Sequence, residues 1–130
     1  MYRTTTRKIE VAVKPRFVPE RSSVDDRCFL WAYTVAITNR GQEPVQLQTR
    51  SWRIIDALGR TKEVRGAGVV GEQPVLQPGE TFEYTSEVPL PTSSGVMTGA
   101  YGMLASTGEA FDIAIPMFSL DSPDTLRTVH

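Results

Sequence analysis

The stretch "FLWAYTVAITN", residues 29–39, decides the fold of this chain. Large apolar residues alternate here with smaller or polar ones. The large apolar residues are Phe29, Trp31, Tyr33, Val35 and Ile37. A period of two places all of them on one face of a β-strand, with that face turned to a core. The residues Asn39, Arg40 and Gly41 supply the turn chemistry that ends the strand.

The same alternation is found on the N-terminal side of this strand. Ile9, Val11 and Val13 alternate with Glu10, Ala12 and Lys14. A strand is therefore predicted here, and Pro15 and Pro19 confine it to a sheet edge or a bend, because proline donates no ladder hydrogen bond.

On the C-terminal side the alternation changes phase. Val45, Leu47 and Thr49 share one face, but the apolar positions then move to Trp52 and Ile54. A slip of one residue predicts a β-bulge or bend around Arg50 and Ser51. Residues 56–59 are expected to form a hairpin tip, from which residues 61–64 return as a short partner strand.

Three further strands are predicted in the second half. The turn at residues 76–80 starts a strand with Phe82, Tyr84 and Ser86 on one face, which Pro89 and Pro91 should stop. Residues 96–105 form a glycine-interrupted strand, and residues 110–115 form another that Pro116 closes, although Phe118 and Leu120 can still pack beyond it.

Short strands separated by turns, with no amphipathic helix, predict an all-β antiparallel sandwich of about seven strands. At 130 residues the chain should form a single domain over residues 1–130, with its core at about 9–120 and a polar tail at 121–130. The 14 basic and 15 acidic side chains nearly cancel, which disfavours broad nucleic-acid binding. Apolar runs are too short for membrane insertion, and the first ten residues lack the apolar core of a secretory leader, so a cytoplasmic location is expected.

The most unusual motif is "VRGAGVVGEQP", residues 64–74, in which Gly66, Gly68 and Gly71 have the G-x-G-x-x-G spacing of dinucleotide-binding loops. That motif needs a helix after the glycines, and here a Pro-Gly turn and a strand follow. We therefore predict a β-loop shaped by glycine. The alternative is a nest of backbone amides that holds phosphate or carboxylate, with Arg65 assisting.

Residues with the usual catalytic and metal-binding chemistry are few. His130 is the only histidine and lies in the tail, and Cys28 is the only cysteine and lies on the face opposite Trp31. Asp25 and Asp26 supply too few oxygens for Mg²⁺ or Ca²⁺ by themselves. The sequence thus predicts no catalytic residue, no metal site and no cofactor.

A protein-binding surface is the remaining candidate. The residues predicted to contribute to it are the apolar pair in the glycine stretch and the residues around the next tyrosine strand: Val69, Val70, Met97, Tyr101 and Met103. An exposed strand edge could also pair two copies of the chain.

The order of motifs resembles the ApaG family. The segments that carry the resemblance, between about Ile9 and Leu120, are FLWAYTVAITN, RSWRIIDALG, VRGAGVVGEQPVLQPGETFEYTS, GVMTGAYGM and EAFDIAIPMFSL. The resemblance implies a fibronectin type III-like or immunoglobulin-like sandwich in a bacterial cytoplasmic protein, and an association with cobalt resistance and magnesium efflux. One departure is Glu87, which follows Tyr84-Thr85-Ser86 where the family commonly has glycine, so the local turn geometry is in question.

These observations favour a non-enzymatic binding module that contacts a partner protein. Two alternatives remain: a binder of small anions, pyrophosphate or nucleotides at Gly66, Gly68 and Gly71, and a regulator linked to divalent cations.

Overall fold

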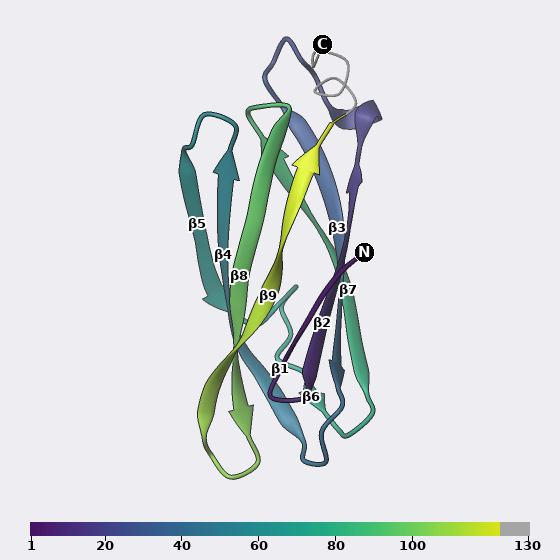
Figure 1. The fold of residues 1–130 in the computed structure, drawn as a ribbon, viewed down its shortest axis with the longest axis vertical. Coiled ribbons are helices and arrows are strands. Elements are labelled where there is room, and N and C mark those ends of the chain that lie inside the picture. The colour runs from purple at the N-terminus through teal and green to yellow at the C-terminus, as the bar shows by residue number, and fades with distance from the viewer. Residues whose placement is uncertain (123–130) are drawn as a thin grey trace.

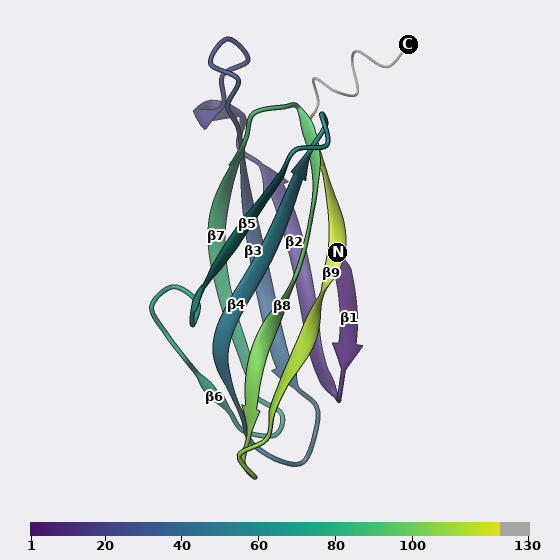
Figure 2. The same cartoon turned by 90° about the vertical axis from the view of Figure 1, so that its left-hand side faces the viewer.

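The computed structural model describes residues 1–122 and places them in two antiparallel sheets packed face to face (Figure 1). One sheet has the order β1 (Tyr2–Thr6), β2 (Ile9–Phe17), β3 (Phe29–Asn39), β7 (Thr81–Leu90). The other has the order β5 (Thr61–Ala67), β4 (Val45–Asp56), β8 (Ser94–Ala105), β9 (Ala110–Asp121), with β6 (Val75–Leu76) paired to β4 (Figure 2). A short 3-10 turn, η1 (Pro19–Arg21), joins β2 to β3. The predicted sandwich is confirmed, with nine strands in residues 1–122 instead of about seven.

The core lies between the sheets, where the alternate residues of the strands meet. Every apolar residue predicted to face inward from β3 is buried there. Trp52 occupies the centre, with its ring edge-on to Tyr101 (centroids 6.3 Å apart) and to Phe118 (6.1 Å). Edge-to-face packing of this kind suits the charge distribution of aromatic rings. The alternation in the sequence therefore predicts the inner face of the molecule correctly.

β1 was not predicted from the sequence, because its segment YRTTT has only one large apolar residue. Its inner residues are only half-buried, and hydrogen bonds hold it beside β9 as well as β2. The Tyr2 hydroxyl lies 3.3 Å from the Ser119 hydroxyl, and the Ala114 amide donates to Thr6 Oγ1 at 3.2 Å. β1 therefore closes one side of the sandwich, and the sheet begins before the predicted core start at residue 9.

Three prolines lie inside strands, and each is accommodated differently. The partner β1 reaches only to Val13, so Pro15 lies on an edge, as predicted. β7 passes Pro89 and ends at Leu90, directly before Pro91, so the predicted end of this strand is confirmed. The predicted stop at Pro116 is wrong, because β9 continues to Asp121. β7 is an edge strand that tolerates proline, and Pro116 lies in a bulge where two β9 residues face Thr98.

Two other local predictions need correction. The predicted slip in β4 exists, but the register shifts between Leu47 and Thr49, not around Arg50 and Ser51. The bulge also explains the phase change, since the residue between these two has no single partner on β8. The strand predicted at 61–64 extends to Ala67, so the first part of the glycine stretch belongs to β5.

The segment around Glu87 is regular strand in β7, and Glu87 is absent from the residues with positive φ. The replacement of glycine there therefore needs no special backbone conformation. In the part of the chain that the structure describes, there is also no helix long and apolar enough to cross a membrane. The polar tail and His130 lie outside the described residues, apart from Asp121 and Ser122.

Candidate functional site

The glycine stretch folds into a tight turn that leaves the body of the sandwich between β5 and β6 (Figure 2). The Val69 amide donates to the Glu72 carbonyl at 2.9 Å, and the Glu72 amide donates back to Val69 at 2.8 Å. The two residues between them have left-handed backbones, with φ of 44° at Val70 and 80° at Gly71. A positive φ at both central residues defines a type I′ turn, which glycine and asparagine form easily and valine does not. We call residues 69–72 the glycine turn.

Hydrogen bonds to β4 hold both ends of the glycine turn. The Gln48 carbonyl, at the β4 bulge, accepts from the Gly68 amide and from Gln73 Nε2, each at 2.8 Å. Gln46 Nε2 in turn donates to the Gln73 carbonyl at 3.0 Å. The bulge thus supplies a carbonyl for the loop, and the turn is fixed relative to the sheet.

The position of Arg50 explains the first glycine of the motif. The Arg50 guanidinium donates to the carbonyls of Ala67 (3.2 Å) and Gly68 (2.9 Å). A Cβ at Gly66 would lie 2.9 Å from three atoms of this guanidinium. Glycine at position 66 therefore lets the cation lie flat against β5.

The other two glycines have backbone roles as well. Gly68 has φ of 63°, and a Cβ there would lie 2.3 Å from the Glu72 carbonyl oxygen. Gly71 has open space around it, so only its φ of 80° requires glycine. The G-x-G-x-x-G spacing thus meets three separate structural demands of one turn.

The structure brings only part of the predicted anion-binding set together. Arg65 and Gly66 line one open pocket with Arg50, whereas Gly68 and Gly71 do not line it. The amides of Gly68, Val69 and Glu72 already donate to carbonyls of the protein. Arg65 lies on the outer face of β5, where its guanidinium is 3.4 Å from the Glu63 carboxylate. The cation near the glycines is Arg50, which the sequence analysis did not single out.

The predicted interaction surface is wrong for four of its five residues. Val69, Met97, Tyr101 and Met103 have no more than 1% of their surface exposed. β8 lies between β4 and β9, so its inner residues face the opposite sheet and contribute to the core. Val70, in contrast, is 57% exposed at the tip of the glycine turn.

Tyr101 and Tyr84 share a hydrogen bond between their hydroxyls across the two sheets. Burial raises the pKa of both phenols far above the ordinary value of 10.0. Burial also raises the pKa of Tyr33 nearby. These hydroxyls therefore stay protonated at neutral pH and serve the packing of the core.

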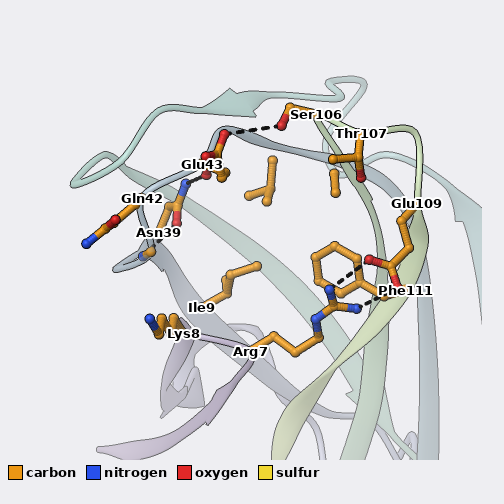
Figure 3. A pocket seen from close by; sticks show the side chains of 13 residues that line it. Arg7, Lys8, Ile9, Asn39, Gln42, Glu43, Ser106, Thr107, Glu109 and Phe111 are labelled. Carbon is orange, nitrogen blue, oxygen red and sulfur yellow. Dashed lines mark hydrogen bonds and ion pairs between the residues drawn. The ribbon is translucent and has the colours of Figure 1, made fainter.

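A cleft of about 390 Å³ lies at one pole of the sandwich, and sequence reasoning did not find it (Figure 3). Ile9, Val45 and Phe111 line it, and Arg7 forms one wall. The Arg7 guanidinium lies 4.1 Å from the Phe111 ring centre and donates to both Glu109 carboxylate oxygens at 2.8 and 3.2 Å. That pairing lowers the pKa of Glu109, and the charged groups of this wall neutralise each other. The residues come from three separate loops and from the strand ends beside them, so no local motif could reveal the cleft.

The fold and the glycine turn together define the class: a small two-sheet antiparallel β-sandwich with a tethered, glycine-shaped turn. A family model described as the ApaG domain matches residues 19–105, from η1 to the end of β8. The chain belongs to the ApaG family, which confirms the resemblance drawn from its motifs.

Full-length relatives and a solved structure agree with this assignment. The chain is 62% identical to Protein ApaG of Rhodopseudomonas palustris (strain TIE-1) over 130 residues, all of both chains. It has the same identity and coverage with Protein ApaG of Afipia carboxidovorans. Among solved structures it is similar to the putative ApaA protein from Bordetella pertussis, with a TM-score of 0.86, 50% identity, and coverage of 88% of this chain and 94% of that one.

Proposed function

We propose that this chain is a non-enzymatic binding module that contacts a partner protein through the glycine turn. The observation that carries the proposal is the exposure and the backbone conformation of Val70. Its aliphatic side chain is 57% exposed, and its backbone has a φ of 44°. A β-branched residue in the left-handed region is strained, and such strain is concentrated at functional sites.

The glycine turn presents its tip rigidly. Val69 is 1% exposed and anchors the turn in the core, whereas its neighbour Val70 faces solvent. Arg50 and the Gln48 carbonyl hold the residues on either side. A contact surface that is already ordered loses little conformational entropy when it binds, so a small apolar tip of this kind can contribute measurably to affinity.

The anion-binding alternative has less support than the protein contact. A nest needs several free amides that point at the ligand, and Gly68, Val69 and Glu72 use theirs within the protein.

A direct role for divalent cations also lacks a supporting observation. In the described residues no group of three or more His, Cys, Asp or Glu side chains is placed to hold a metal ion. We propose that the association of the family with cobalt resistance and magnesium efflux operates through the cytoplasmic partner of the module, not through an ion bound to it.

Affinity capture from a bacterial lysate tests the proposal when it compares two aspartate variants with the wild-type protein. Val70→Asp places a charge at the tip, and aspartate tolerates a left-handed backbone better than valine does. Val24→Asp is the matched control, since Val24 is a 62% exposed valine in the loop between η1 and β3. The proposal expects at least one protein that the wild type and Val24→Asp retain and Val70→Asp loses. Equal retention by all three folded proteins would contradict it.

A further inference from the structure

The outer edge of β5 is an open strand edge. One side of β5 pairs with β4, and in residues 1–122 no strand pairs with its other side. At the far edge of the same sheet, β9 has β1 beside it, with the bonds from Tyr2 and Thr6 described above. An unpaired edge of seven residues is a template for another strand.

Hydrogen bonds at the two ends of β5 show to which side of the strand the amide and carbonyl of each residue point. The Gly68 amide donates to the Gln48 carbonyl, and the Arg60 carbonyl accepts from the Asp56 amide, so both positions face β4. The amide and carbonyl of one residue point to the same side of a strand, and successive residues alternate. The pairing of β4 with β5 has no register shift. The backbone groups of Thr61, Glu63, Arg65 and Ala67 therefore point outward, and of these the Ala67 carbonyl also accepts from the Arg50 guanidinium at 3.2 Å.

We propose that β5 pairs antiparallel with β5 of a second copy of this chain, about a two-fold axis at Val64. Glu63 of each copy then lies opposite Arg65 of the other, and Thr61 lies opposite Ala67. In this register every outward-pointing residue meets an outward-pointing partner, so the ladder is complete over the whole strand. The two five-stranded sheets become one continuous sheet with an isologous interface.

Charge selects this register over its neighbours. The neighbouring registers that also pair outward-pointing residues have their two-fold axis at Glu63 or at Arg65. The first places Glu63 opposite Glu63 of the second copy, and the second places Arg65 opposite Arg65. Like charges directly opposite destabilise a strand pair, whereas opposite charges stabilise it. Only pairing centred on Val64 gives two Glu–Arg pairs, and both lie on the outer face of the sheet beside Arg53 and Ser51.

The inner face of the strand also fits this arrangement. Val64 is half-buried and packs against the core, so the two valines on the axis would meet and extend that core. Lys62 lies opposite Gly66 of the second copy, whose inner face the Arg50 guanidinium of that copy covers. The exposed Lys62 side chain therefore has to extend into solvent at this position. The other free edge, β7, is less suited to self-pairing, because it contains Pro89 and two glutamates, Glu83 and Glu87.

Sedimentation equilibrium with two single charge variants tests the proposal. The wild type should form a dimer in a concentration-dependent manner. Glu63→Lys and Arg65→Glu should each weaken self-association about tenfold or more, since two attractive pairs become repulsive. An equimolar mixture of the two variants should restore dimers, because positions 63 and 65 then carry opposite charges in both cross-strand pairs of the mixed dimer. A wild type that stays monomeric at all concentrations, variants that self-associate as strongly as the wild type, or a mixture that fails to recover would each overturn the proposal.

A cysteine pair tests the register directly. Val64 forms a pair without hydrogen bonds across the axis, where Cα atoms are close enough for a disulfide. In a Cys28→Ser background, Val64→Cys should form a covalent dimer on mild oxidation, and Lys62→Cys should form several-fold less. Equal yields from the two variants would contradict a two-fold axis at Val64.

Discussion

At the residue scale, two adjacent residues of the glycine turn both have a left-handed backbone, but only one of them is a residue type that adopts it easily. Gly71 suits its φ of 80°, whereas Val70 at 44° does not. Selection for stability alone would favour glycine or asparagine at both positions. The valine therefore indicates a requirement for an exposed aliphatic side chain at the tip.

Substitution at the two positions should change stability in opposite directions. Val70→Asn should raise the free energy of unfolding by about 1 kcal/mol, because asparagine tolerates the left-handed backbone. Gly71→Ala should lower it by about 1 kcal/mol through its backbone alone, since a Cβ there meets no neighbouring atom. Urea unfolding of the three proteins measures both changes. A Val70→Asn variant less stable than the wild type would show that the valine is not strained.

A double-mutant cycle should show that Gly66 and Arg50 act together. Gly66→Ala displaces the guanidinium and weakens its bonds to two carbonyls, which should lower the free energy of unfolding by roughly 1–2 kcal/mol. In an Arg50→Met background, Gly66→Ala should lower the free energy of unfolding by about 1 kcal/mol less. An Arg53→Met background serves as the control, since Arg53 pairs with Glu63 on the other face of the sheet. Equal losses in all backgrounds would contradict the role given to Gly66.

The sequence predicted that the glycine motif forms a β-loop, but it could not predict which individual residues are exposed. The absence of a following helix was sufficient to predict a shaped β-loop. Exposure depends on which strands flank a segment, and a single sequence does not contain that information. For this reason the surface predicted for Met97, Tyr101 and Met103 is wrong. The contact of Arg50 with the glycine stretch could not be predicted either, because its partners are backbone carbonyls.

At the element scale, the two sheets are joined by a polar contact as well as by apolar packing. Tyr84 on β7 and Tyr101 on β8 bond through their hydroxyls inside the core. Each phenol has a raised pKa, so the folded protein holds both protons at pH values where the unfolded chain releases them. Burial of the two phenols therefore makes stability depend on pH in the alkaline range.

The direction of that dependence follows from the raised pKa values. Well below pH 10 both states hold the two protons, and the stability is unaffected. Above pH 10 the unfolded chain loses them first, so the free energy of unfolding should fall as pH rises, by roughly 3 kcal/mol per pH unit for the two groups. The double variant Tyr84→Phe/Tyr101→Phe should show a clearly shallower decline in urea unfolding measured between about pH 9 and 11. Identical slopes would contradict the assignment.

Most strands could be predicted from their alternation, and the errors have identifiable causes. β1 has threonines where a core strand has aliphatic residues, because it covers the side of the sandwich instead of its centre. Pro116 does not end β9 as predicted, because a bulge accommodates it, and Pro89 lies inside β7 because that strand is at an edge. Edges and bulges are properties of pairing, so the sequence of one strand cannot reveal them.

At the scale of the whole molecule, the sandwich has one closed side and one open side. β1 and β9 meet on the closed side, whereas β5 and β7 are the strand edges of the open side. The glycine turn follows β5 directly and is tied to β4 (Figure 2). The open side therefore combines an exposed apolar tip with a free strand edge, and we propose that the domain binds its partners there.

We propose Val70 as the contact through which this domain binds its partner. The most direct measurement is isothermal titration calorimetry of the partner retained in the capture experiment against the wild type, Val70→Asp and Val24→Asp. The predicted result is at least a roughly tenfold loss of affinity for Val70→Asp, as expected when a charge replaces an apolar anchor, with Val24→Asp equal to the wild type. Equal affinity of Val70→Asp and the wild type would contradict the claim.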